Sequence, residues 1–185
     1  MEHDSAKYRR RSIRLRDYDY GQQGAYGVTI CTQNRELYFE NGSIAEIAER
    51  CWIAIPQHFP MVELDEWVLM PNHLHGILVI ISGNDIRRGV QLNAPTPLRN
   101  SANKYSEMSP PRNTLGLIVR TYKAAVTTRC RRESYNYFSW QRNYYERIIR
   151  DEAHLNRVRQ YIISNPAKWA EDIYNPTNSL GKEDL

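Results

Sequence analysis

Three runs of apolar and β-branched residues along the chain have the length and boundaries of strands. They cover Gly24 to Thr32, Val62 to Met70 and His73 to Ile81, and turn-forming residues flank each run. Only Pro71 and Asn72 separate the second run from the third, which predicts a tight hairpin. A fourth strand is expected over residues 137–140, continuing into 144–149, because aromatic and branched side chains recur there.

Three further segments repeat their apolar residues every three or four positions, as amphipathic helices do. The first is expected to start at Ser43 as N-cap, with Glu46 three residues later, and to end at Pro56. The second runs from Thr114 to about residue 132, and the third from Asp151 to just before Pro166. The apolar stripe of the last helix consists of Leu155, Val158, Tyr161 and Ile162.

The resulting order is β-α-β-β-α-β followed by one helix, which predicts an α+β fold of the ferredoxin-like type. That fold is an antiparallel four-stranded sheet with helices on one face. Residues 82–113 are rich in Gly, Asn, Pro and Ser with little periodicity, so they are expected to form a long flexible excursion. We therefore expect residues 1–185 to form a single domain with this excursion and a polar C-terminal tail.

Composition narrows the class of protein. The chain has 185 residues, and 25 Lys and Arg against 21 Asp and Glu give a net charge of +4. No apolar run approaches the roughly 18–20 residues that cross a bilayer, and the polar first twenty residues do not form a secretory signal. Three widely spaced cysteines give no disulfide framework. These features predict a cytoplasmic protein with no membrane partner.

The positive charge consists mainly of arginine and is clustered among many tyrosines, 13 in all. Guanidinium groups bind phosphates and aromatic rings stack on bases, so the pattern is typical of binding to single-stranded nucleic acid. A solvated surface with ordinary ion pairs fits the charge equally well. The residues expected to contact nucleic acid are Arg9, Arg10, Arg11, Arg14, Arg129, Arg131, Arg132 and Arg142.

His73 and His75 are the sharpest local feature. Residues i and i+2 of a strand point to the same face about 6.5–7 Å apart, so both imidazoles can converge on one ion. Two histidines with oxygen ligands and open positions suit a catalytic divalent metal that also accepts a phosphate oxygen. The alternative is that one or both are polar residues on the solvated face of an antiparallel sheet, since an HxH pair alone is weak evidence for a metal site.

A tyrosine is the candidate nucleophile, because the chain has no GxSxG sequence and no phosphate-binding GxxxxGK[ST] loop. The second absence argues against a nucleotide cofactor. Tyr161 and Asn165 are four residues apart on one helix face. Attack by a tyrosine on a phosphodiester conserves the bond energy in a phosphotyrosine link, and the Asn165 amide oxygen can be a third metal ligand. Tyr161 also belongs to the apolar stripe, so a packing role is the alternative.

Two stretches of the sequence carry a resemblance to a known family. WVLMPNHLH at residues 67–75 resembles the histidine–hydrophobic–histidine motif of the single-tyrosine HUH transposases. FSWQRNYYERIIRDEAHLNRVRQYIISNPAKW at residues 138–169 and the opening YRRRSIRLRDYDY are similar to the REP-associated tyrosine transposases, a bacterial group related to small insertion-sequence transposases. The resemblance extends from about Tyr8 to Trp169 and leaves residues 82–113 and the tail unmatched.

The resemblance implies metal-dependent endonuclease and strand-transfer activity on single-stranded or hairpin DNA through a 5′-phosphotyrosine. His73 and His75 match the metal pair, Tyr161 matches the nucleophile, and Asn165 matches a position where the family places a polar side chain close to the metal. Tyr144, in an adjacent tyrosine pair, is the second choice of nucleophile. Mg²⁺ or Mn²⁺ is the implied ion, and either a monomer or a homodimer fits.

Two other functions stay open on the sequence. A single-stranded nucleic-acid-binding module of ferredoxin-like fold without catalysis would show aromatic residues on an exposed sheet face. A metal-dependent nuclease that hydrolyses DNA with water would use Tyr161 only for packing. Arg147, where many relatives of the resembled family have histidine, leaves the role of the last strand open.

Overall fold

The structure is a computed structural model that describes residues 19–81 and 114–176. No helix within these two ranges has both the length and the apolar character needed to cross a bilayer. The expected excursion at 82–113 and the last nine residues of the tail lie outside the described residues. The same holds for four of the expected nucleic-acid contacts, Arg9, Arg10, Arg11 and Arg14.

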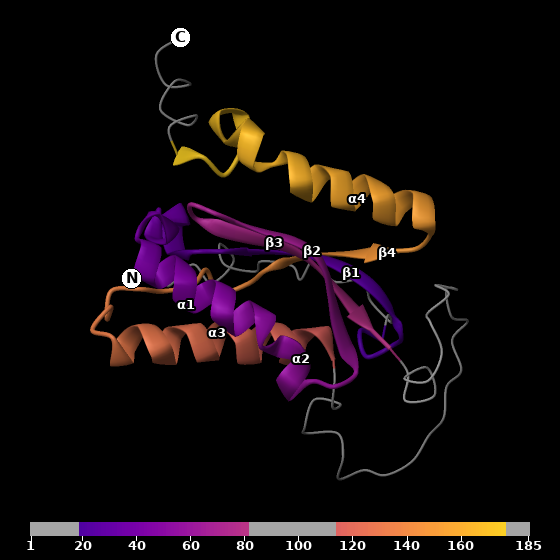
Figure 1. Ribbon diagram of the computed structural model, residues 1–185, viewed down its shortest axis with the longest axis horizontal. Coiled ribbons are helices and arrows are strands. Elements are labelled where there is room, and N and C mark those ends of the chain that lie inside the picture. Colours follow the sequence, from indigo (N-terminus) through magenta and orange to yellow (C-terminus); the bar gives the residue numbers. More distant parts are fainter. Residues whose placement is uncertain (1–18, 82–113, 177–185) are drawn as a thin grey trace, which may run out of the picture.

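A four-stranded antiparallel sheet forms the centre of the fold, with the strand order β2-β3-β1-β4 (Figure 1). The first three strands match the expected runs to within one residue, so those predictions are confirmed. The hairpin between β2 and β3 pairs Met70 with His73, which leaves a two-residue turn as expected. The strands are β1 (Gly24–Cys31), β2 (Val62–Met70), β3 (His73–Ile80) and β4 (Tyr145–Ile149).

The expected fourth strand is only partly correct, because residues 137–140 do not join the sheet. Trp140 forms one isolated bridge to Thr32, and β4 begins at Tyr145. The aromatic side chains of this segment pack as a cluster instead. The centroid of the Phe138 ring lies 6.0 Å from that of Phe39 and 5.1 Å from that of Trp140. Aromatic residues close together in sequence can bury their rings in such a cluster as well as in a strand, so the pattern does not distinguish the two.

Helices cover both faces of the sheet (Figure 1). Two long helices, α1 (Gly42–Ile53) and α3 (Leu115–Arg132), lie on one face with the short α2 (Ile55–His58), and α4 (Glu152–Ser164) lies on the other. Short 3₁₀ turns complete the chain: η2 (Gln33–Arg35), η3 (Tyr38–Glu40) and η4 (Pro166–Glu171). The α+β class is therefore confirmed.

The ends of the helices follow capping chemistry, with one correction. Ser43 is not the N-cap of α1, because the side chain of Asn41 accepts the hydrogen bond from the Ser43 amide at 3.1 Å and the helix starts at Gly42. α1 ends at Ile53, and Pro56 lies in the first turn of α2, where its missing N–H costs nothing.

The alternation of side chains along β3 divides the interior into two cores. Leu74 and Leu78 point toward α1 and α3, into a core whose largest fully buried side chain is that of Trp52. Ile77 lies in the smaller core beneath α4, together with Leu155. Since His73 and His75 have the same parity as Ile77, β3 presents both imidazoles to the face that α4 covers.

Candidate metal centre and nucleophile

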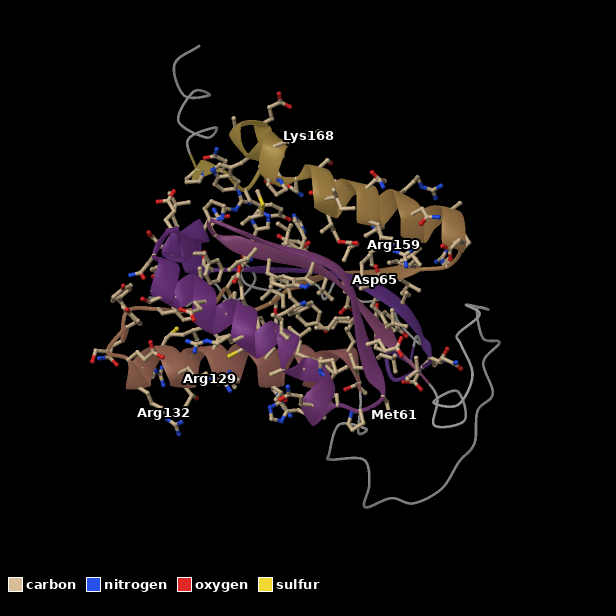
Figure 2. All side chains as sticks on the ribbon, viewed as in Figure 1. Met61, Asp65, Arg129, Arg132, Arg159 and Lys168 are labelled. Atoms are coloured by element: carbon tan, nitrogen blue, oxygen red, sulfur yellow. The ribbon has the colours of Figure 1, made fainter. Side chains whose placement is uncertain are left out.

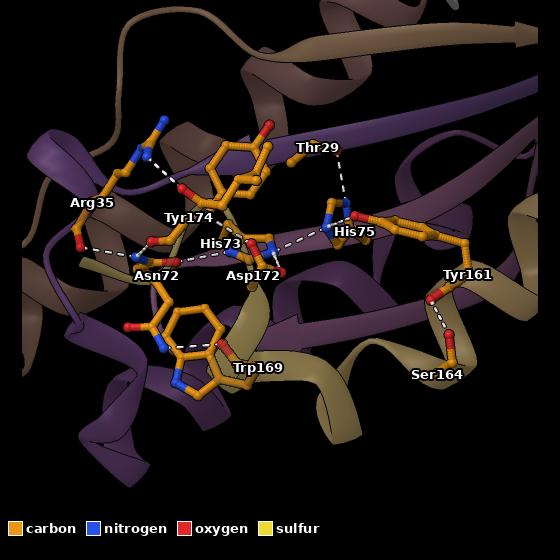
Figure 3. A network of polar contacts seen from close by, with 12 residues as sticks. Thr29, Arg35, Asn72, His73, His75, Tyr161, Ser164, Trp169, Asp172 and Tyr174 are labelled. Atoms are coloured by element: carbon orange, nitrogen blue, oxygen red, sulfur yellow. Dashed lines mark hydrogen bonds and ion pairs between the residues drawn. The ribbon is translucent and has the colours of Figure 1, made fainter. Parts of the chain in front are cut away.

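The two histidines lie at the start of β3, directly after the hairpin turn, and their rings are buried (Figure 3). Relative exposure is 0% for His73 and 5% for His75, so the alternative of two solvated polar residues is wrong. The Nε2 atoms of the two rings are 3.0 Å apart. The spacing of a strand thus brings both imidazoles to one point, as the sequence predicts.

Each imidazole has a polar partner on its other nitrogen. His73 Nδ1 lies 2.8 Å from the side-chain oxygen of Asn72, and His75 Nδ1 lies 2.7 Å from the hydroxyl of Thr29 on β1. Such contacts to Nδ1 orient the rings of metal-binding histidines and leave Nε2 for the ion.

Burial keeps both rings neutral near pH 7. Desolvation, aided by the charges of His75 and Arg35, lowers the pKa of His73 to about 3. Desolvation also lowers the pKa of His75 to about 4. The neutral imidazole is the form that binds metals. Both rings are therefore in the neutral form that can bind a metal.

A buried carboxylate completes this group. Asp172 follows η4, and its Oδ2 lies 3.9 Å from His73 Nε2 (Figure 3). The ligand atoms of His73, His75 and Asp172 all lie within 4.8 Å of one another. Two cis ligands about 2.1 Å from a metal stand about 3.0 Å apart, which is the separation of the two histidine nitrogens. The donors present therefore fit a divalent cation.

Sequence reasoning missed Asp172. It follows a short 3₁₀ turn, and no spacing links it to a pair of histidines almost a hundred positions earlier. Asn165, the ligand that the sequence suggests, is buried at the C-terminal end of α4. Its side-chain nitrogen makes no hydrogen bond to the described residues. Ligation by Asn165 stays a prediction.

Tyr161, on α4, lies beside the cluster of His73, His75 and Asp172, the candidate metal site. Its hydroxyl lies 3.4 Å from His75 Nε2, and its ring meets the His75 ring edge to face at 5.2 Å between centroids (Figure 3). Tyr161 is 52% exposed, so it is not a core residue. This exposure argues against the packing role that its place in the apolar stripe suggests. An exposed phenol beside a buried donor cluster is accessible to a large substrate.

An ion pair and an apolar stripe hold α4 against the sheet. Leu155 and Ile162 are buried in the smaller core. Arg159 donates from Nε to Oδ1 of Asp65 at 2.8 Å and from Nη2 to Oδ2 at 2.6 Å, which joins α4 to β2 (Figure 2). Such a bidentate pair fixes direction as well as distance. It lies two residues before Tyr161 and so restrains the candidate nucleophile.

The other candidate tyrosine lies elsewhere. Tyr144 is half-buried and packs against the core beneath α1 and α3. Its neighbour Tyr145 is 42% exposed, with its ring 6.3 Å from that of Tyr174. Of the candidates proposed from the sequence, Tyr161 is the one that the fold brings to the histidine pair.

The predicted arginine cluster lies on the opposite side of the sheet. Arg129, Arg131 and Arg132 are exposed residues in the last turn of α3, whereas the histidines face α4. Figure 2 shows Arg129 and Arg132 on this helix. Arg129 and Arg132 line an open cavity of about 380 Å³ together with Arg50 and Glu133. Arg142 is exposed just before β4. The arginines at the end of α3, here called the basic surface, therefore lie on the other side of the sheet from the candidate metal site.

Comparisons with known proteins bear on this arrangement. No family model matches the chain. An uncharacterized protein of Haemophilus influenzae is 38% identical over 179 residues, which covers 92% of this chain and 96% of that protein. A solved structure of a REP-associated tyrosine transposase bound to a REP hairpin is similar, with a TM-score of 0.56 and 18% identity over 84% of this chain and 73% of that one. That likeness shows a shared fold.

Proposed function

We propose that this chain, which belongs to one family with the Haemophilus influenzae protein and has the fold of the REP-associated tyrosine transposase, is a transposase-type enzyme acting on single-stranded DNA. The proposed activity is metal-dependent endonuclease and strand-transfer chemistry through a covalent 5′-phosphotyrosine. The observation that carries the proposal is the 3.4 Å distance between the Tyr161 hydroxyl and Nε2 of His75, itself 3.0 Å from His73.

The topology supports the ferredoxin-like interpretation of the catalytic domain. The antiparallel order β2-β3-β1-β4 is the order of a split βαβ sheet. β3, which carries both histidines, lies between two neighbours and is buried along its whole length. A central strand is a rigid platform for ligands, and α4 supplies the tyrosine from above it.

The metal would be held by Nε2 of His73, Nε2 of His75 and the Asp172 carboxylate, with the Asn165 amide oxygen as a further ligand. Mg²⁺ or Mn²⁺ accepts such a mixed nitrogen and oxygen set. When bound, the ion would polarise a non-bridging phosphate oxygen and stabilise the charge that develops there.

The protein's own residues would carry out the substitution at phosphorus. The Tyr161 phenol oxygen attacks phosphorus, and the bond between phosphorus and the 3′ oxygen breaks. The leaving 3′ oxygen takes a proton from solvent and becomes a free 3′-hydroxyl. The phenolic proton passes to solvent, because the side chain is half exposed. Attack of a 3′-hydroxyl on the phosphotyrosine reverses these events and joins strands with no nucleotide cofactor.

A hairpin DNA is the proposed partner, in line with the REP hairpin named for the structural neighbour. Phosphate contacts would come from the basic surface at the end of α3 and from Arg142, and the N-terminal arginines would add to them. DNA transposition or processing of REP elements is the proposed biological role.

A binding module without catalysis is less favoured by the structure. Modules of this kind bind bases on aromatic residues of an exposed sheet face. Here α1 and α3 cover one face of the sheet and α4 covers the other (Figure 1). Every residue of β3 is buried.

The test uses a labelled single-stranded oligonucleotide that carries a hairpin, incubated with the full chain and Mg²⁺ or Mn²⁺. Denaturing gels should show a covalent protein–DNA adduct with the wild type and none with Tyr161→Phe, which removes only the hydroxyl. Tyr145→Phe is the matched control and should keep the adduct. Cleaved strands without an adduct would indicate hydrolysis by water, and intact shifted DNA would indicate a binding module. A phosphotyrosyl peptide containing Tyr144 would overturn the choice of nucleophile.

A further inference from the structure

Asn72 is a fully buried polar residue in the hairpin turn, and its side chain makes three hydrogen-bond contacts (Figure 3). Its Nδ2 donates to the carbonyl oxygen of Arg35 at 3.0 Å and to that of Tyr174 at 2.7 Å. Its Oδ1 lies 2.8 Å from Nδ1 of His73. These contacts join the loop after β1, the start of β3 and the segment after η4.

The contacts determine which nitrogen of His73 carries the proton. Because the Asn72 amide nitrogen donates to two carbonyl oxygens, its oxygen must be the atom that faces His73. A side-chain carbonyl oxygen only accepts hydrogen bonds, so Nδ1 of His73 must donate. In the neutral ring Nε2 then has a free lone pair, and that atom faces His75 Nε2 and the Asp172 carboxylate.

The same side chain fastens the segment that carries Asp172. Tyr174, whose carbonyl Asn72 binds, donates its backbone N–H to Oδ1 of Asp172 at 2.7 Å. That bond turns the other carboxylate oxygen toward His73, at 3.9 Å. Arg35 supports the same segment by donating to the carbonyl oxygen of Ile173 at 2.8 Å.

The backbone of Asn72 is held as firmly as its side chain. The carbonyl oxygen of Asn72 accepts a hydrogen bond from the Thr32 amide at 2.9 Å. The residue is therefore restrained from both ends, and its amide group has little freedom to rotate away from His73.

We propose that Asn72 is a positioning residue of the metal centre, which holds the proton of His73 on Nδ1 and fastens the Asp172 segment over the histidine pair. Only the metal part of this inference rests on the proposed function; the proton position and the fastening concern the metal-free protein. Outer-shell partners of this kind typically change metal affinity 10- to 100-fold when they are removed.

The first measurement needs no variant. Long-range ¹H–¹⁵N NMR of histidine-labelled, metal-free wild type distinguishes the two neutral forms of an imidazole. His73 is expected to show its proton on Nδ1, with the signal assigned by its loss in His73→Ala. A proton on Nε2 would overturn the proposal even if every Asn72 variant failed to fold.

Two variants separate the two tasks of the residue. Asn72→Ala removes both tasks, so the His73 proton should distribute between the nitrogens and Mn²⁺ affinity, measured by calorimetry, should fall 10- to 100-fold. Asn72→Asp keeps an acceptor for Nδ1–H but places an oxygen against the carbonyls of Arg35 and Tyr174. The Nδ1 proton should stay, while amide exchange of Tyr174 and Asn175 should accelerate about tenfold. Unchanged exchange in both variants would refute the fastening.

Thr29→Val is the matched control, because it removes the partner of His75 Nδ1 and leaves Asn72 intact. The His73 proton should remain on Nδ1 in this variant. An Asn72→Ala protein with wild-type Mn²⁺ affinity and an unchanged His73 signal would overturn the proposal. Absence of a DNA adduct in the wild type would refute the proposed function alone, since the proton position and the exchange rates are read without DNA.

Discussion

Replacement of Gly76 by alanine should destabilise the protein, because this glycine is where β3 meets the ring of Trp52. A Cβ atom at Gly76 would lie 2.4 Å from Cζ2, 3.1 Å from Cη2 and 3.2 Å from Cε2 of that ring. Carbon atoms in ordinary contact stand about 3.5–4.0 Å apart, so the ring would have to move by about 1 Å. The ring is fully buried and packs edge to face on Tyr122, at 5.3 Å between centroids, so it cannot shift freely.

Overpacking of a dense core costs about 1–3 kcal/mol, and the closeness of this contact places Gly76→Ala at about 3 kcal/mol. For a chain of this size the melting temperature should fall by about 6–12 °C. Urea unfolding followed by tryptophan fluorescence and thermal unfolding followed by circular dichroism measure both quantities. The slope of the urea transition should not change, because the native fold is kept.

Gly27→Ala on β1 is the matched control, since a Cβ there would meet Val158 Cγ1 at an ordinary 3.7 Å. It should change stability by less than about 0.5 kcal/mol or increase it slightly. The double variant Gly76→Ala with Trp52→Phe should lose at least about 1 kcal/mol less than the sum of the single variants, because the smaller ring makes room. Equal costs for the Gly76 and Gly27 variants would refute the close packing of Trp52 on β3.

Three further outcomes are expected. Asp65→Asn should cost about 1 kcal/mol at pH 7, a value reduced because Arg159 is partly exposed. The hydrogen bonds from Arg159 lower the pKa of Asp65, so this stabilisation is present above the carboxyl's ordinary pKa and is lost as the pH falls below about 4. Urea midpoints of the wild type and the variant at pH 7 and pH 2.5 measure this loss. An equal cost of the substitution at both pH values would contradict the pairing. His75→Ala should abolish the DNA adduct yet change DNA affinity in a filter assay less than about threefold, because phosphate contacts dominate binding; full cleavage with Mg²⁺ would refute the metal assignment. Reversing the charge of Arg129 and Arg132 should flatten the log–log salt dependence of binding by about 0.7 for each phosphate that the protein no longer neutralises; an unchanged slope would place the DNA on another surface.

Much of the secondary structure can be predicted from the sequence, because strand and helix periods are local properties. β2 matches its expected run residue for residue. Thr114 and Asp151, expected as the first residues of two helices, are the N-caps of α3 and α4. The errors are also local. The pattern predicts Ser43 as a cap although Asn41 takes that role, since either side chain can accept from an early helical amide.

The candidate site is predictable to the same extent. The i, i+2 spacing puts His73 and His75 on one face of a strand, and the i, i+4 spacing puts Tyr161 and Asn165 on one face of a helix. These relations hold in any fold that keeps those elements. Whether the helix face meets the strand face depends on tertiary packing. In this fold the two faces do meet, since the Tyr161 hydroxyl lies 3.4 Å from His75 Nε2.

Only the tertiary structure decided which distant side chains join the site. Asp172 and Asn72 are a hundred residues apart, and the Asp172 carboxylate reaches His73 because Asn72 and Arg35 bind the segment after η4. α4 lies across the sheet from Arg129 because the two faces of the sheet bury two different apolar stripes. Local sequence encodes the period of each stripe, but the free energy that selects its partner comes from burying both surfaces together, a property of the whole folded chain.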